Sequence, residues 1–182
     1  MYNCHCRRVD VRMGGGITLD FATDKADIGG EKQKSSDSYT YQFGLGWNMS
    51  PYVRSEIGFQ NSAFKFSDAH ATNQQGFAML YFDLARRYVE RGDVTRRRSF
   101  IPFIGVGAGA GYYEFEGVGG AHGVAFAAPR AEAGFTLMLT DLMGLDFAYQ
   151  YQMMHGKGFG WNTDNSNTSH ISNVVASLRF NF

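Results

Sequence analysis

The chain has 182 residues, with 17 basic and 17 acidic side chains and a formal net charge of +0 at neutral pH. This length suits one domain of ordinary size, and the balanced charge excludes a general attraction to nucleic acid. Glycine and aromatic residues are abundant (Gly 23, Phe 16, Tyr 10), whereas proline and cysteine are scarce (Pro 3, Cys 2). Such a composition is typical of all-β chains, because aromatic side chains suit pleated surfaces and glycine marks close packing or bends.

The first eight residues carry both cysteines, in Cys4-His5-Cys6. A zinc site needs two more ligands at suitable spacing, and none is nearby. We therefore expect no metal site and no cofactor, and we interpret residues 1–8 as an N-terminal remnant that is disordered. This segment also lacks the apolar core of a secretion signal. If the protein is exported, its signal is expected to have been removed or to lie upstream.

Alternation of apolar and polar residues with a period of two predicts strands with one apolar face. In residues 172–182 the even positions are mostly apolar and the odd positions mostly polar, and residues 9–21 alternate equally cleanly. Strand 76–85 is apolar on both faces; we place Ala78, Leu80 and Phe82 outward with Leu84, which puts Asp83 inside. The eight predicted strands are 9–21, 39–49, 52–63, 76–85, 100–113, 130–139, 145–152 and 169–182.

The connections between these strands differ in length. Polar loops are predicted at 22–38, 64–75, 114–123 and 155–167, and short turns at 50–51 and 140–144, with an intermediate basic connection at 86–99. An even number of strands with short turns on one side is the pattern of outer-membrane barrels. A long strand at the end of a chain also needs a partner, and the first strand can supply it. The sequence therefore predicts one all-β domain over residues 9–182, an eight-stranded antiparallel up-and-down transmembrane barrel.

No helix-like apolar run approaches the roughly 18 residues that a membrane helix needs, but strands of about 9–11 residues can also cross a bilayer. Three features indicate that the apolar face points to lipid. Glycines gather on the polar face, where a narrow eight-stranded interior needs small residues, and tyrosine and tryptophan lie near strand ends, as in interfacial girdles. The polar face also carries charges of both signs, which predict a charge network in the lumen: Asp10, Arg12, Arg54, Glu56, Arg130, Glu132, Asp146 and Arg179.

The segments FIPFIGVGAGAGYYEF, LDFAYQYQ and SLRFNF resemble the eight-stranded opacity-protein and outer-membrane-protein-A-like surface antigens of Gram-negative bacteria. The resemblance implies a place in the cell outer membrane, with long loops extracellular and both termini periplasmic. It also implies that the barrel-assembly machinery reads the terminal aromatics Phe180 and Phe182. The basic connection departs from the short periplasmic turns of that family. On the periplasmic side it is either a solvated turn or a contact for acidic headgroups or an acidic partner, through Arg86, Arg87, Arg91, Arg96, Arg97 and Arg98.

Three functions remain open at this point. The first is a structural or surface-interaction protein whose loops meet an unknown extracellular or periplasmic protein, in a membrane of outer-membrane lipids including lipopolysaccharide. The second is a narrow porin-like channel. The third is a lipid-modifying hydrolase, because His170-Ile171-Ser172 resembles the His-x-Ser pair of the lipid A deacylase family. That family needs a glutamate farther along, and none follows Ser172, so we expect no enzyme. The sequence also shows no platform of aromatic and basic residues, so we expect no nucleic-acid partner.

Overall fold

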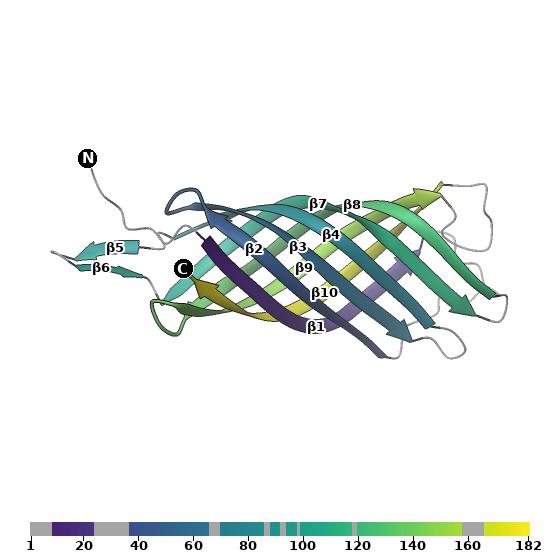
Figure 1. Cartoon of the computed structure of the whole chain (residues 1–182), viewed down its shortest axis with the longest axis horizontal. Coiled ribbons are helices and arrows are strands. Elements are labelled where there is room, and N and C mark those ends of the chain that lie inside the picture. Colours follow the sequence, from purple (N-terminus) through teal and green to yellow (C-terminus); the bar gives the residue numbers. More distant parts are fainter. Residues whose placement is uncertain are drawn as a thin grey trace.

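Eight antiparallel strands close into a barrel in the order β1-β10-β9-β8-β7-β4-β3-β2, and β5 and β6 form a separate two-stranded sheet (Figure 1). This computed structural model describes residues 9–23, 37–65, 70–85, 88–91, 94–97, 99–117, 120–157 and 166–182. The described residues contain no helix that is long and apolar enough to cross a membrane. The predicted eight-stranded antiparallel barrel is confirmed, with these strands: β1 (Val9–Thr23), β2 (Asp37–Asn48), β3 (Val53–Lys65), β4 (His70–Asp83), β5 (Tyr88–Arg91), β6 (Val94–Arg97), β7 (Phe100–Gly117), β8 (Gly120–Met138), β9 (Met143–Lys157) and β10 (Ser166–Asn181).

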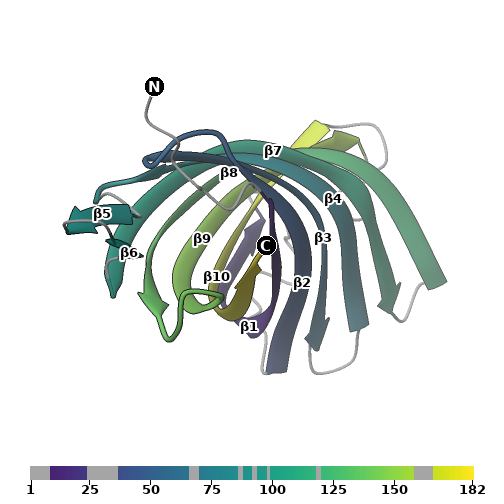
Figure 2. The ribbon, with the colours of Figure 1, turned by 60° about the vertical axis from the view of Figure 1, so that its left-hand side comes forward.

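Pairing of β1 with β10 closes the wall. Their register runs from Asp10 opposite Asn181 to Thr23 opposite Ser169, with an irregularity between Thr18 and Asp20. The start of β1, the end of β10 and the β5–β6 hairpin lie at one end of the barrel, which we call the turn end (Figure 1). The opposite end is called the loop end. Seen at another angle, the strands are inclined to the barrel axis, and β5 and β6 stand outside the wall (Figure 2).

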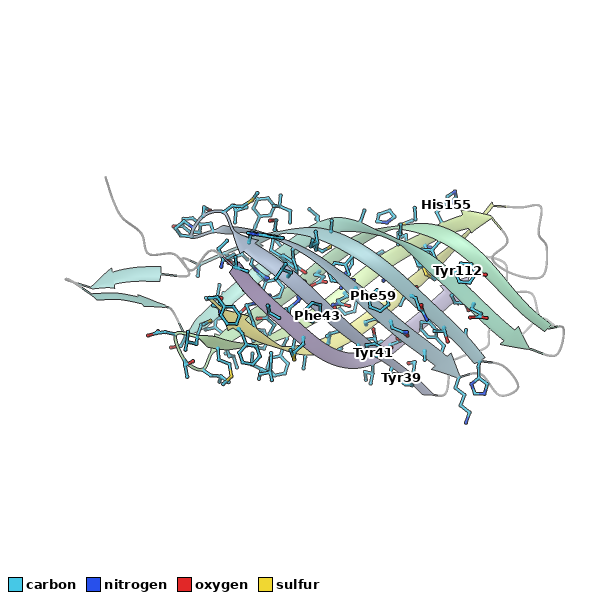
Figure 3. The ribbon with its side chains drawn as sticks, viewed as in Figure 1. Tyr39, Tyr41, Phe43, Phe59, Tyr112 and His155 are labelled. Carbon is cyan, nitrogen blue, oxygen red and sulfur yellow. The ribbon has the colours of Figure 1, made fainter. Side chains whose placement is uncertain are left out.

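The outer face of the barrel is apolar over most of its height. Exposed large hydrophobic side chains come from seven of the eight wall strands, all except β8, the reverse of the arrangement that water favours. Tyr39 and Tyr112 lie farther towards the loop end than Tyr41, Phe43 and Phe59 (Figure 3). Tyrosines at the border of an apolar belt are typical of membrane interfaces. The belt also includes Met13, Ile17, Leu19, Trp47, Ile57, Phe82, Ile104, Val106, Tyr149, Tyr151, Val174 and Leu178.

The ambiguous strand of the sequence, β4, has the predicted phase. Phe82 and Leu84 are exposed, and Asp83 is buried in the interior. Phe77, Met79 and Tyr81 of the same strand also point inward and are buried. The second apolar face of this strand therefore packs inside the barrel rather than against lipid.

The strands extend farther towards the loop end than the sequence predicted. Most of the predicted loops at 64–75 and 114–123 is strand, and β9 and β10 take the two ends of the loop predicted at 155–167. The basic connection 86–99 likewise contains β5 and β6, paired from Tyr88 opposite Arg97 to Arg91 opposite Val94. The long irregular loops predicted in these regions were therefore wrong in extent.

The cause at the loop end is a reversal of polarity along the barrel. At the tops of β3, β4 and β7 the outward side chains are polar, as at Lys65, Gln74 and Glu114. At the same height the inward side chains become apolar. The alternation continues, but here the apolar side chains point inward and the polar ones outward. A prediction that looks for apolar side chains on the outside therefore ends the strands too early. The apolar interior cluster comprises Phe64, Ala71, Tyr113, Phe126, Ala128, Met154 and Ile171.

Glycines in the inner wall allow interior side chains to lie directly on the backbone. A Cβ added at Gly105 would lie 2.5 Å from Cδ1 of Tyr81, whereas one at Gly76 would meet nothing nearer than the Gly58 carbonyl oxygen at 3.9 Å. We predict that Gly105→Ala lowers the unfolding free energy by about 1–3 kcal/mol, because overpacking forces the tyrosine ring to move. Gly76→Ala, the matched control, should change it by less than about 0.5 kcal/mol. Urea unfolding in lipid vesicles measures both, and equal effects would contradict the steric account.

Candidate functional site

The candidate site is the charge network inside the barrel, in the half nearer the turn end. All eight predicted lumen residues point inward and are buried, and Arg12, Arg54 and Arg179 are at most 1% exposed. A charge this deeply buried is costly unless it is paired and hydrogen-bonded. The contacts of these side chains therefore decide whether the interior is filled or open.

Arg179 of β10 connects three strands at the part of the network nearest the turn end. Its guanidinium donates to Asp10 of β1 at 2.5 Å and to Asp146 of β9 through two nitrogens. Asp146 also accepts a 2.7 Å hydrogen bond from the hydroxyl of Thr136. Two nitrogens of one guanidinium on one carboxylate hold both groups in a fixed orientation.

Glu132 of β8 is the centre of the network. Its carboxylate lies 2.5 Å from a nitrogen of Arg130 and 3.3 Å from a nitrogen of Arg12, which reaches across from β1. Arg12 also lies 2.6 Å from Glu56 of β3. One carboxylate from β8 and one from β3 therefore neutralise an arginine that spans the lumen.

Tyr81 of β4 is a member of the network that the sequence analysis did not assign to it. Its hydroxyl accepts a 2.8 Å hydrogen bond from Arg12 and donates one of 3.0 Å to Glu132. The Arg54 guanidinium lies over its ring, with Cζ 3.9 Å from the centroid. The signal was available, because the phase that puts Asp83 inside also puts Tyr81 inside. Since β4 is apolar on both faces, its aromatic residue was not considered as a polar partner.

Glutamine side chains form the next layer towards the loop end. Arg130 donates to Gln60 at 2.6 Å and to Gln42 at 3.1 Å, and Gln42 accepts a further bond of 2.8 Å from Gln150. Gln42 in turn donates to Ser177 of β10. These bonds connect β2, β3, β8, β9 and β10 across the interior. The alternation places these glutamines on the polar faces of their strands, but it does not show which of them meet across the interior.

Glycines of β2 make room for the carboxylates. A Cβ at Gly44 would lie 2.5 Å from an oxygen of Glu56, and one at Gly46 would lie 2.5 Å from an oxygen of Asp10. The acidic side chains therefore lie against bare backbone. This is the physical reason for the glycines on the polar face of this strand.

His170 and Ser172 lie on the outer face of β10, on the opposite side of the wall from the network. They do not contact each other: the Ser172 hydroxyl accepts a 2.9 Å hydrogen bond from Tyr149, and Nδ1 of His170 lies 2.6 Å from the hydroxyl of Tyr151. A serine nucleophile needs a base within hydrogen-bond reach. In this arrangement each candidate residue is held by a tyrosine instead.

Comparison with known proteins finds similar folds among solved structures but no match in sequence. No protein-family model matches the chain, and no curated protein matches it in sequence. Among solved structures, Neisserial surface protein A has a TM-score of 0.68 at 11% identity, covering 96% of this chain and 97% of its own. Ail, the attachment invasion locus protein of Yersinia pestis, has a TM-score of 0.57 at 13% identity, with 95% and 98% covered. The outer membrane protein OprG from Pseudomonas aeruginosa has 0.53 at 14% identity, with 98% and 97% covered.

The chain has the fold of the eight-stranded outer-membrane barrels. In this barrel the main chain of Phe182 continues the closure, because its N–H donates to the carbonyl of Val9 at 2.9 Å. The Phe182 side chain is exposed at the turn end and that of Phe180 is half-buried. The side chains of the basic connection lie outside the described residues, as do residues 1–8 with Cys4 and Cys6.

Proposed function

We propose that this protein is an outer-membrane anchor, a closed barrel with a filled interior that holds its outer connections in place for contact with other molecules. The observation that carries the proposal is the burial of the lumen charges. Four arginines and five carboxylates are enclosed in the described part of the interior, each at most 4% exposed. A water-filled pore would wet such groups. Eight strands leave an interior just wide enough for side chains to fill.

The apolar belt supports a place within the membrane. Closed barrels satisfy every backbone hydrogen bond without water, and outward apolar residues between aromatic girdles match the hydrocarbon region. We assign the loop end to the cell exterior, because bacterial barrels have their short turns in the periplasm. The connections 24–36 and 158–165 would then carry recognition, since binding residues concentrate on loops of a rigid scaffold.

Planar bilayer recordings test the anchor against the channel. We expect the purified wild-type barrel to show no stable conductance steps, because the ion pairs and the apolar cluster both obstruct the lumen. A folded barrel is verified in parallel by its shift between unboiled and boiled gel samples. Reproducible single-channel steps from folded protein would overturn the filled interior and favour the narrow channel.

Epitope insertion tests the orientation. An epitope placed within residues 158–165 should bind antibody on intact cells, whereas one at Asp141, in the turn between β8 and β9, should bind only after the outer membrane is permeabilised. The reverse result would place the loop end in the periplasm. That result would contradict the proposed recognition role of the connections, but not the proposal that the barrel is a membrane anchor.

A further inference from the structure

Two residue pairs on the outer wall line a small depression near the loop end, between β4 and β7. Its lining side chains are Thr72, Gln74, Tyr112 and Glu114. Thr72 is paired with Glu114 and Gln74 with Tyr112, and paired residues of an antiparallel sheet share a face. Tyr112 marks its place on the outer wall in Figure 3. We call it the β4–β7 depression. It belongs to the wall itself and not to the connections that the proposed function assigns to recognition.

The size of the depression limits what it can hold. Its volume is about 50 Å³, whereas one water molecule needs about 10–15 Å³. It therefore holds a group of only a few heavy atoms, and a larger group such as a sugar ring would remain outside. Gln74, Tyr112 and Glu114 are exposed and Thr72 is half-buried, so such a group can enter from outside the barrel.

Each lining side chain carries an oxygen that can accept a hydrogen bond. These oxygens are the hydroxyls of Thr72 and Tyr112, the amide carbonyl of Gln74 and the carboxylate of Glu114. Among the residues whose side chains are described, none forms a hydrogen bond or an ion pair with any of these four side chains. The oxygens are therefore available to a ligand that donates hydrogen bonds.

The charge of the depression favours a cation. Of the four described residues that line it, only Glu114 is charged. Lys65 and His70 form the next pair of β3 and β4 towards the loop end, and neither lines the depression. A carboxylate attracts cations and repels anions such as phosphate. The Tyr112 ring is 51% exposed, and the face of such a ring attracts an ammonium group.

The set of oxygens suits an ammonium group better than a metal ion. Ca²⁺ takes about six to eight oxygen ligands, often from several carboxylates, and the depression offers one carboxylate. No group of three His, Cys, Asp or Glu side chains that could hold a metal is present in the part of the chain that the structure describes. A primary ammonium carries one positive charge and donates through each of its N–H groups, which matches one carboxylate beside neutral oxygens.

The wall on the turn-end side of the depression leaves room for an alkyl chain. Gly76 is paired there with Ala110, so neither strand projects a bulky side chain. Gly76 is exposed, and a Cβ added to it would meet nothing nearer than 3.9 Å. The alkyl part of a ligand can therefore lie against the wall while its polar end enters the depression.

We propose that the β4–β7 depression binds the primary ammonium group of an alkyl amine. The N–H groups donate to Glu114, Gln74 and Thr72, and the charge faces the ring of Tyr112. The amine can belong to a free molecule or to a lipid headgroup, because both present the same group. Only the lipid source rests on the proposed membrane location.

Titration of the barrel folded in dodecyl maltoside micelles tests the proposal, because this detergent carries no ammonium group. The ligand is butylammonium chloride. The comparison ligands are 1-butanol, which has no charge, and tetramethylammonium chloride, a cation without N–H groups. The backbone amide NMR signals of Thr72 and its neighbours report binding and give the Kd. We expect butylammonium to bind with the lowest Kd of the three.

Two variants test the residues. Glu114→Gln keeps the shape of the side chain and should raise the Kd for butylammonium roughly fivefold, as for the loss of an exposed ion pair. Tyr112→Leu removes the ring and should raise the Kd roughly two- to fivefold. The matched controls are Asp141→Asn, an exposed carboxylate at the turn end, and Tyr39→Leu, an exposed ring of β2. Both controls should leave the Kd unchanged, and the gel shift shows that each variant is folded.

An unchanged Kd in Glu114→Gln overturns the site, and equal binding of 1-butanol overturns the ammonium assignment. Equal binding of tetramethylammonium overturns the hydrogen bonds to the side-chain oxygens. Dihexanoylphosphatidylethanolamine and dihexanoylphosphatidylglycerol, which have the same chains, then separate the two sources of the amine. A lower Kd for the first supports a lipid headgroup, and equal values support a free amine. Loss of the gel shift in wild-type protein would instead count against the barrel itself.

Discussion

Glu132→Ala should lower the unfolding free energy of the barrel by about 3–5 kcal/mol, the cost typical of removing one partner from a buried ion pair. Glu132 contacts Arg12, Arg130 and the Tyr81 hydroxyl, so its loss leaves two arginines without their shared carboxylate. Among the described residues, Arg12 keeps Glu56, whereas Arg130 keeps the neutral oxygens of Gln42 and Gln60 and its contact with the Phe77 ring. The larger part of the cost should therefore come from Arg130.

Urea unfolding in lipid vesicles, followed by the gel shift, measures this effect. Glu114→Ala is the matched control, because Glu114 is exposed on the outer face of β7 and should change stability by less than about 0.5 kcal/mol. Tyr81→Phe keeps the ring under Arg54 and removes one hydroxyl, so an intermediate loss of about 1–3 kcal/mol is expected. If Glu132→Ala unfolds with the wild-type profile, the network does not hold the interior together.

Ile57→Arg should cost about 2–4 kcal/mol, the range for arginine near the middle of a bilayer. Ile57 lies on the outer face of β3 and is 53% exposed. On the same strand and face, Ala63 lies six residues nearer the loop end and is paired with Tyr39 at the border of the belt. Ala63→Arg should cost no more than about 1 kcal/mol, because near an interface the side chain reaches water.

The comparison of these two variants locates the membrane on the wall. Both place one arginine on the same strand, so strand propensity and side-chain size are matched. Unfolding from vesicles should separate them, whereas a barrel surrounded by water would tolerate both equally. Equal stability of the two variants would remove the main support for the apolar belt as a lipid-facing surface.

The period-two pattern was sufficient to predict the strands, their closure and the inward position of the charges. Arg12 and Arg179 lie in alternating segments whose other face is apolar. If the apolar face contacts lipid, both arginines must point into the interior. The pairing partners could not be read in the same way. Contact between Arg12 and Glu132 depends on strand tilt and register across 120 residues of sequence.

The tops of the strands were mispredicted for a related reason. Ala71 points inward and His70 outward, so the segment alternates with the apolar face inside. Because its outward side chains are polar, unlike those of the membrane belt, such a segment resembles a polar loop in the sequence. The backbone pairing of Asp20 with Ser172 could not be predicted from the sequence either, because the irregularity after Thr18 shifts the register by one residue.

Closure through β1 and β10 also constrains the order in which the chain can fold. The contact between Asp10 and Arg179 joins residues 169 positions apart, the longest separation in the interior network. Each neighbouring hairpin can form locally, but this seam carries the entropy of closing the whole chain and must come late. Until then β1 and β10 expose unpaired edges, which are prone to join other chains. Arg179 can pair with Asp146 as soon as the β9–β10 hairpin forms, whereas its contact with Asp10 of β1 forms only when β1 joins β10. The contact of Arg12 of β1 with Glu132 also needs the closed barrel, so several buried contacts form together and the final step should be cooperative.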